Sequence, residues 1–430
     1  MKTKADLHKI YDTMWKLSPH VIPLFLVILT TSLNKTFANF AYVANQSGDN
    51  VSVIDTATNT VVATVTVSGS PGEVAITPDG SRAYVTDQIS NNVSVIDTAT
   101  NTVIVIVPVG TMPLGVAITP DGGRAYVANQ VSNNVSVIDT ATNTVIATVT
   151  NGADTDPSII AINPDGSRAY VTNDHTNNVS VIDTATNTII ATVAVGHAPF
   201  GIAITPDASH AYVVNNNDNT VSVINTATNM VTATIPVDSL APNAVAITPN
   251  ESHAYVTGLR NLVFVIDTDT NTVAATVTVG IDPFGVAITP DGSRAYVTND
   301  NTNNVSVIDT ATNTIIATVS VGTNPLGIAI TPNFHPRISI EPPTHLTGHQ
   351  EKNDFGVALE RFNLLQWNLS PSVGVVGYFI YRNSIKIATL NASTFQFEDH
   401  DRKKGVSTLY SVTAFDDVGN ESAAQTVVIK

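Results

Sequence analysis

The sequence repeats itself at a nearly constant period. The tripeptide Ala-Tyr-Val occurs seven times, and successive copies are separated by 42, 42, 44, 42, 43 and 41 residues. The Tyr residues are Tyr42, Tyr84, Tyr126, Tyr170, Tyr212, Tyr255 and Tyr296. Each unit of about 40 residues is long enough for several short strands, and repetition of this kind indicates the blades of a β-propeller.

One repeat shows the expected strands. The apolar run 115–119 ends at a Pro-Asp-Gly turn, and 124–129 follows as a second strand. Residues 135–139 and 144–149 predict a third and a fourth strand, separated by the turn sequence Thr-Ala-Thr-Asn. These runs are short, rich in β-branched residues and bounded by turn formers. Several are apolar on both faces, which suits sheets packed between two neighbouring sheets.

The positions of these runs predict how the ring closes. The innermost strand of a blade is the run before Pro-Asp-Gly, and seven such runs begin near Gly72, Leu114, Ser158, Gly201, Ala244, Gly285 and Gly327. The repeats start with a second strand at 41–43 and end with an innermost strand at 327–331. We therefore expect seven blades, the first completed by the last strand of the series, so that the ring has no open edge.

The repeat resembles the YVTN family of β-propellers, which is seen in surface-layer and other exported proteins. The resemblance rests on the runs 126–129, 170–173 and 296–299, on the Val-Ile-Asp strand ends and on the Thr-Pro-Asp-Gly turns. It covers about 295 of the 430 residues. The fold predicted is all-β, with a seven-bladed propeller over residues 39–334 followed by a small β-sandwich.

The C-terminal part has a different pattern. Prolines mark residues 335–343 as a linker, and residues 344–430 contain strand-like runs around Trp367, Tyr378 and Tyr410. This segment resembles a fibronectin type III domain, whose buried Trp and late Tyr strand it shares. Such modules act as spacers or adhesion units.

The N-terminus predicts export. Four Lys residues precede an apolar run at 21–33, which is shorter than the ~20 residues of a membrane span. We predict a signal peptide over residues 1–38, with cleavage near Ala38; the alternative is an uncleaved membrane anchor. Both place the remaining chain in the periplasm, at the cell surface or outside the cell, with membrane contact through this segment alone.

Charge argues against a nucleic-acid partner. Residues 40–334 contain 23 acidic residues, five Arg and no Lys, a formal net charge of −18. Such a domain repels phosphate backbones. Single-stranded DNA binding, known among exported YVTN-type propellers, would need a basic groove with exposed aromatic side chains. The chain has no Cys, which excludes disulfides and thiolate metal sites.

The repeats differ mainly on one side of the predicted ring. The Pro-Asp-Gly and Thr-Ala-Thr-Asn turns are nearly identical throughout and fall on one face, which we call the constant face. The connections after the second strand and before each innermost strand differ in every blade and fall on the other, the variable face. Because recognition needs asymmetry, we expect any binding site there. Its candidate residues are Glu73, Asp87, Asp156, His175, His197, Phe200, Arg260, Asp282 and Phe284.

Two classes of function remain open at this stage. The first is a binding or adhesion scaffold for a protein or glycan at the cell surface, without a cofactor. The second follows from the similarity to lyase-like and lactonase-like propellers, which would place acids, His and a divalent metal at the channel mouth, with Glu73, His197 and Asp282 as candidates. That alternative requires at least three polar side chains to converge in one pocket. The repeated turn aspartates are expected to accept hydrogen bonds within their own turns. Asp267 with Asp269, and Asp399 with Asp401, are calcium candidates that lack the rest of a calcium-loop spacing.

Overall fold

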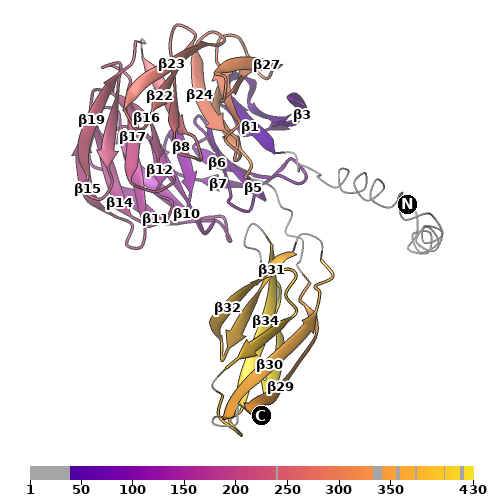
Figure 1. Ribbon diagram of the computed structural model, residues 1–430. Helices are drawn as coiled ribbons and strands as arrows, with labels where there is room; N and C mark the ends of the chain where they lie inside the picture. Colours follow the sequence, from indigo (N-terminus) through magenta and orange to yellow (C-terminus); the bar gives the residue numbers. More distant parts are fainter. Residues whose placement is uncertain are drawn as a thin grey trace, which may run out of the picture. The chain divides into compact units, whose positions relative to one another are not determined.

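The structure is a computed structural model that describes residues 39–238, 241–332, 341–354, 359–372, 375–400, 402–416 and 421–430. The chain divides into two compact units, Met1–Phe334 and His335–Lys430 (Figure 1). The predicted signal peptide and most of the predicted linker lie outside the described residues. Within the described ranges, no helix has the length and apolarity needed to cross a membrane.

The first unit is a seven-bladed propeller, as predicted, built from seven four-stranded antiparallel sheets (Figure 1). The inner strands are β4 (Pro71–Ile76), β8 (Pro113–Ile118), β12 (Pro157–Ile162), β16 (Pro199–Ile204), β20 (Pro242–Ile247), β24 (Pro283–Ile288) and β28 (Pro325–Ile330). The second strands are β1 (Phe40–Asn45), β5 (Arg82–Asp87), β9 (Arg124–Asn129), β13 (Arg168–Asn173), β17 (His210–Asn215), β21 (His253–Gly258) and β25 (Arg294–Asn299).

The two remaining positions of each blade are equally regular. The third strands are β2 (Asn50–Asp55), β6 (Asn92–Asp97), β10 (Asn134–Asp139), β14 (Asn178–Asp183), β18 (Thr220–Asn225), β22 (Leu262–Asp267) and β26 (Asn304–Asp309). The outer strands are β3 (Thr60–Thr66), β7 (Thr102–Pro108), β11 (Thr144–Thr150), β15 (Thr188–Ala194), β19 (Met230–Pro236), β23 (Thr272–Thr278) and β27 (Thr314–Ser320). A short 3₁₀ turn, η1 (Gln46–Gly48), joins β1 to β2.

The last inner strand closes the ring. Blade 1 has the strand order β28-β1-β2-β3, whereas blades 2 to 7 are each continuous in sequence. Phe40 and Thr331 secure the junction, because the backbone N–H of Thr331 donates to Phe40 O and Phe40 N–H donates to Thr331 Oγ1, both over 2.8 Å. Closure gives blade 1 the inner strand that each other blade takes from its own continuous sequence, so β1 has no unpaired edge, which confirms the predicted architecture.

The burial pattern of the strands shows how adjacent blades pack. The second and third strands are buried on both faces, and their Val, Ile, Tyr and Ala side chains fill the space between adjacent sheets. For example, Tyr42 and Val51 of blade 1 pack with Val74 and Val85 of blade 2. The outer strands alternate between exposed and partly buried residues, as expected for a sheet that meets solvent on its outer side.

On the constant face, polar side chains tie each blade to the next. Tyr side chains of the second strands donate to Asn Oδ1 in the Thr-Ala-Thr-Asn turn of the following blade, over 2.7–2.9 Å; the pairs are Tyr42–Asn101, Tyr84–Asn143, Tyr126–Asn187, Tyr212–Asn271, Tyr255–Asn313 and Tyr296–Asn59. The turn aspartates serve their own turns, as expected. Asp121 Oδ1 accepts from Thr119 Oγ1 and Gly123 N–H, and these hydrogen bonds, that of Thr119 first, lower the pKa of Asp121.

On the variable face, the residue before each inner-strand Pro has a left-handed backbone with φ between 48° and 55°; these residues are Ser70, Met112, Asp156, Ala198, Ala241, Asp282 and Asn324. A non-Gly residue in this region stores strain of about 1–3 kcal/mol. Among the described residues, six of the seven donate their backbone N–H to an Asx Oδ1 of the preceding blade, such as Met112 to Asn91 over 2.8 Å. These hydrogen bonds fix the rim of the variable face.

The second unit is a β-sandwich (Figure 1). One sheet has the order β29 (Thr344–Asp354), β30 (Leu359–Asn368), β33 (Gln396–Asp399). The other has the order β32 (Ile385–Asn391), β31 (Val375–Arg382), β34 (Thr408–Asp416), β35 (Gln425–Ile429). Trp367, Tyr378 and Tyr410 lie in its core, and the rings of Trp367 and Tyr378 meet edge to face at 5.6 Å.

Candidate functional site

The seven inner strands surround a cavity of about 170 Å³. Each inner strand begins with Pro. The cavity wall includes residues of all seven strands, mostly Val, Ile, Ala and Gly. The described polar side chains in its lining are Glu73 and Asn243.

The third residue of each inner strand decides how much of the wall is backbone. In four strands it is Gly, and at Gly115 an added Cβ would lie 2.6 Å from Ser158 O and 2.8 Å from the Ile159 Cα. Larger side chains are therefore excluded where two inner strands approach this closely. In the other three strands the position is Glu73, Ile159 or Ala244. Of these three, only Glu73 is ionisable.

In four blades a threonine of the second strand bridges its own inner strand to the next inner strand, and in blade 7 Thr298 does so at Gly285. Thr86 Oγ1 accepts the N–H of Glu73 over 2.9 Å and donates to Leu114 O of the next blade over 2.7 Å. Thr172 and Thr257 make the equivalent pair of hydrogen bonds in blades 4 and 6. Glu73 is thus held by its backbone at a fixed point of the wall.

Glu73 is an acid in an apolar environment. Its side chain is partly buried beside Gly327, whose added Cβ would lie 2.8 Å from Glu73 Oε1. Within the described residues it has no ion-pair partner, and the N–H of Val74 donates to Oε1 over a long 3.3 Å. Burial raises the pKa of Glu73 to about 7, and the Val74 hydrogen bond opposes this rise. The carboxyl group therefore exchanges a proton near neutral pH.

Two phenylalanines meet at the cavity. Phe200 of β16 and Phe284 of β24 belong to blades 5 and 7, yet their ring centroids lie 5.6 Å apart with an edge-to-face angle of 80°. They meet because blade 6, which lies between them, has the smaller Asn243 at the same strand position. Asn216 Nδ2 donates to Asn243 Oδ1 over 3.2 Å and orients this amide. The cavity is therefore asymmetric, with two aromatic rings, one amide and one carboxyl group.

The structure brings three of the predicted site residues to this cavity, namely Glu73, Phe200 and Phe284. The other candidates on the variable face lie elsewhere. His197 is exposed and pairs with Asp218 at 2.8 Å, and Asp282 accepts a hydrogen bond from Asn301. Arg260 is exposed in the three-residue connection between β21 and β22. The grouping of Glu73 with His197 and Asp282 that the enzyme alternative needed does not form around this cavity.

Asp156 and His175 lie at the rim of blade 4, together with Asp174. The N–H of Asp174 donates to Asp156 O over 3.2 Å, and the N–H of His175 donates to Thr155 O. Burial raises the pKa of Asp174, and the neighbouring charge of Asp156 adds to the rise. The sequence analysis missed Asp174 and Asn243. Their positions in the repeat could have indicated them. Asn243 occupies the position of Phe200 and Phe284, and Asp174 occupies that of Asn216, which hydrogen-bonds to Asn243.

Asp87 is fully buried between β5 and β6, away from the cavity lining. Ser94 Oγ donates to Asp87 Oδ2 over 2.6 Å, whereas Asp87 Oδ1 has no hydrogen-bond partner among the described residues. Burial raises the pKa of Asp87 to about 6, and the hydrogen bond from Ser94 opposes this rise. Five other blades have Asn at this position.

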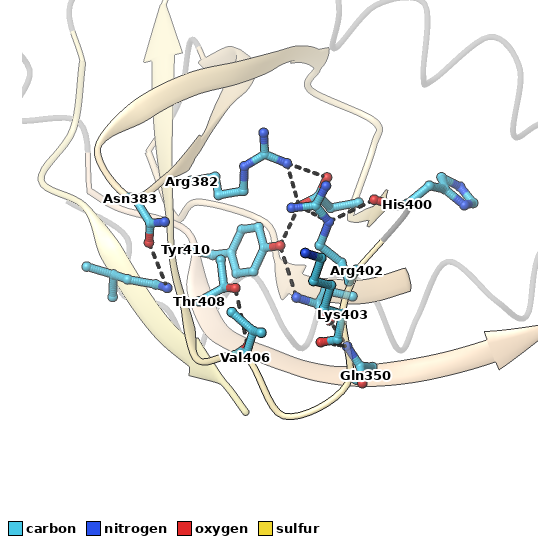
Figure 2. Close-up of polar contacts among 12 residues, drawn as sticks. Gln350, Arg382, Asn383, His400, Arg402, Lys403, Val406, Thr408 and Tyr410 are labelled. Carbon is cyan, nitrogen blue, oxygen red and sulfur yellow. Dashed lines mark hydrogen bonds and ion pairs between the residues drawn. The ribbon is translucent and has the colours of Figure 1, made fainter. Parts of the chain in front are cut away.

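The sandwich has its own polar cluster, to which Arg382, Arg402 and Tyr410 belong (Figure 2). These three residues contact Asp399. Arg382 Nη1 lies 2.9 Å from Asp399 Oδ1, and the hydroxyl of Tyr410 donates to Oδ2. Arg402 Nε approaches the same oxygen at 3.5 Å. Both oxygens of Asp399 thus have cationic or hydroxyl partners, which leaves this carboxylate poorly suited to calcium; Asp401 lies outside the described residues. In the part of the chain that the structure describes, no cluster of three metal-ligating side chains occurs.

Comparisons with known proteins agree with the propeller. The YNCE-like beta-propeller family matches residues 117–207, and the family described as Lactonase, 7-bladed beta-propeller, matches residues 29–145. Each match covers less than half of the chain. No curated protein matches the sequence.

Solved structures show the same fold. Hydrazine synthase of Kuenenia stuttgartiensis aligns with a TM-score of 0.59 and 28% identity, over 63% of this chain and 92% of that chain. A protein of unknown function from Desulfotomaculum acetoxidans aligns with a TM-score of 0.62 and 20% identity, over 69% and 99%. Dihydro-heme d1 dehydrogenase NirN in complex with DHE aligns with a TM-score of 0.54 and 15% identity, over 69% and 76%. The chain is a β-propeller protein.

Proposed function

We propose that the propeller is a ligand-binding module, and that its site is the cavity between the inner strands. The observation that carries this proposal is the pair Phe200 and Phe284, which meet edge to face at a cavity whose wall is otherwise largely aliphatic. Binding pockets are typically apolar, with a few placed polar groups that fix the orientation of the ligand. Glu73 and Asn243 are the polar groups of this wall.

The lining argues for binding rather than catalysis. General acid–base or nucleophilic chemistry needs several groups within hydrogen-bond reach of one another and of the reacting atoms. The described lining offers a single ionisable group, Glu73. A binding site does not need a second ionisable group, because apolar contacts supply affinity and one polar group supplies selectivity.

Lactone hydrolysis is a second candidate, because the lactonase family match covers residues 29–145 and so includes Glu73. In that case Glu73 would act as a general base toward water, and a pKa near 7 suits that role. The described part of the chain offers no further acid, His or metal cluster at the cavity.

The setting of the module is part of the proposal. We propose an exported protein that works in the periplasm, at the cell surface or outside the cell, with a protein or glycan as the larger partner of the variable face. The sandwich sheets, β29-β30-β33 and β32-β31-β34-β35, support a fibronectin type III-like spacer, because that fold also pairs two antiparallel sheets around a buried Trp. The net negative charge of the propeller disfavours nucleic acid.

Ligand-observed NMR with a set of monocyclic aromatic fragments, neutral, cationic and anionic, tests the binding site. We expect some fragments to bind the wild type, to compete with one another, and to be lost in the double variant Phe200→Ala/Phe284→Ala. Ile89→Ala is the matched control, because Ile89 is a 79% exposed apolar residue of the variable face outside the cavity lining. Fragments that bind the double variant as well as the wild type would refute this site.

A second experiment tests lactone hydrolysis. A panel of γ- and δ-lactones is followed by pH-stat titration with the wild type and with Glu73→Gln. Acid release that is abolished by Glu73→Gln would replace the binding proposal with the lactonase alternative.

A further inference from the structure

The variable face is acidic. The connections between the second and third strands and those before the inner strands contain eight Asp residues, one Arg and no Lys. The Asp residues are Asp49, Asp154, Asp156, Asp174, Asp218, Asp238, Asp282 and Asp300. A concave site lined by charge of one sign concentrates ligands of the opposite sign. This face therefore attracts cations.

Two of these acids follow directly after second strands. Asp174 follows β13, and Asp300 follows β25. The same position in blade 5 is Asn216, which hydrogen-bonds to Asn243 of the cavity wall. In blade 2 it is Gln88, whose Nε2 would lie 2.6 Å from a Cβ added to Gly72 of the inner strand. Asp174 and Asp300 occupy this position in blades 4 and 7, where Asp300 Oδ1 accepts from Asn324 Nδ2 over 2.8 Å, and both add negative charge to the variable face.

The wall itself suits an organic cation. Aromatic faces attract ammonium groups, and a carboxylate nearby adds a direct ion pair. Phe200 and Phe284 supply the rings and Glu73 supplies the carboxylate, while most of the other lining side chains are aliphatic. A cavity of about 170 Å³ has room for one six-membered ring, since an engineered protein cavity of about 150 Å³ binds benzene.

We propose that the cavity binds a small organic ammonium ion, with an aryl or alkyl group against the apolar wall and its ammonium group on Glu73. This inference rests on the proposed binding function and names its ligand class. Quaternary ammonium ions and protonated primary amines both combine a positive charge with a hydrocarbon group. The cavity volume limits the hydrocarbon group to about the size of a phenyl ring.

Binding should release a proton near neutral pH. An ammonium ion favours the ionised form of Glu73, so it lowers the pKa of this group from its raised value of about 7. None of the other residues of the seven inner strands is titratable, and the acids that follow second strands on the variable face are Asp174 and Asp300. Affinity should therefore rise between about pH 6 and 8, as the carboxyl group loses its proton.

Isothermal titration calorimetry tests the inference with benzylammonium chloride and benzyl alcohol, which differ mainly in charge. We expect benzylammonium to bind at least about tenfold more tightly than benzyl alcohol at about pH 8, a difference of ~1.4 kcal/mol. Glu73→Gln should remove this preference and the proton release, measured as a dependence of the heat on the buffer. Asp154→Asn is the matched control, because it removes an exposed carboxylate of the same face and should change the affinity less than threefold.

The outcomes separate this inference from the proposed function. If benzyl alcohol binds as tightly as benzylammonium, or if Glu73→Gln keeps the preference, the cation inference is wrong and the binding site stands. If neither compound binds while other fragments bind in a manner that Phe200→Ala/Phe284→Ala abolishes, the cation inference again fails alone. If no fragment binds at the cavity, both fail. Thermal melting of each variant shows whether it is folded.

Discussion

At the scale of the residue, the last position of the second strand shows how exchanging an amide nitrogen for a carboxyl oxygen removes a hydrogen-bond donor. In blade 1, Asn45 Nδ2 donates to Asn50 Oδ1 and to Ser52 Oγ, over 2.8 and 2.9 Å. Blades 3, 4, 5 and 7 repeat this pair of hydrogen bonds. Blade 2 has Asp87, which lacks the amide donor, so Asn92 Oδ1 is buried without a partner among the described residues. Asp87 Oδ1 has no partner there either, but the same holds for Asn45 Oδ1, Asn129 Oδ1 and Asn299 Oδ1 in other blades. An unpaired buried acceptor costs about 1–3 kcal/mol.

Replacing Asp87 with Asn should stabilise the propeller in a pH-dependent manner. The pKa of Asp87 is about 6 in the folded state and near 4 when exposed, so the folded state holds an extra proton between these values. The contribution of Asp87 to wild-type stability therefore falls as the pH rises from about 4 to 6. Asp87→Asn does not titrate, so its advantage should grow across this window and reach roughly 1–3 kcal/mol above it. Urea unfolding at several pH values measures the difference.

Asn129→Asp is the matched reversal in blade 3, because Asn129 makes the same two hydrogen bonds. It should destabilise the propeller by a similar amount above about pH 6. Equal stability of Asp87→Asn and wild type at all pH values would show that the carboxyl group of Asp87 finds partners when ionised.

At the scale of the element, the interfaces between blades depend on single Tyr hydroxyls. Tyr296 OH donates to Asn59 Oδ1 over 2.7 Å, joining blade 7 to blade 1. The equivalent atoms in blades 4 and 5, Tyr170 OH and Asn229 Oδ1, have no partners among the described residues. The two Tyr side chains are otherwise alike, since both are fully buried in second strands.

Tyr296→Phe should therefore lower the free energy of unfolding by about 1–3 kcal/mol, because it leaves the partly buried Asn59 acceptor without its donor. Tyr170→Phe is the matched control and should change stability by less than about 0.5 kcal/mol, since its hydroxyl makes no such hydrogen bond. Chemical denaturation of both variants gives the comparison. Equal losses in the two would mean that Tyr170 is hydrogen-bonded in solution.

The strands could be predicted from the sequence because period-2 patterns and turn residues recur seven times. The runs 124–129 and 135–139 correspond to β9 and β10, and the closure by 327–331 corresponds to β28. The composition of the cavity could not be predicted in the same way. Phe200 and Phe284 are 84 positions apart in the numbering, and they meet only because Asn243 leaves space between them. The sequence pattern places His197 and Glu73 on the same face of the ring. It does not show that His197 lies away from the cavity and pairs with Asp218.

At the scale of the whole molecule, the two compact units predict independent folding. Residues 39–332 contain every strand of the ring, whereas a chain that ends at residue 320 lacks β28 and exposes the inner side of β1. We expect residues 39–332 to melt at the temperature of the propeller in the full chain, within about 2 °C. The chain ending at residue 320 should melt at least roughly 10 °C lower or fail to fold, since it loses an entire buried strand. Differential scanning calorimetry measures both, and similar melting temperatures for the two truncated chains would contradict a structural role for ring closure.

The pairing of β28 with β1 also sets an order of events as the chain emerges, N-terminus first, from a ribosome or a translocation channel. The partner of β1 ends at residue 330, so about 285 residues must follow β1 before its inner edge is covered. At ~5–20 residues per second, that delay is roughly 15–60 s. During this time blade 1 presents an unpaired strand edge to whatever lies nearby, including the β28 segment of another newly made copy. Crowding of nascent chains should therefore favour strand-exchanged dimers, whereas dilution should favour closed monomers.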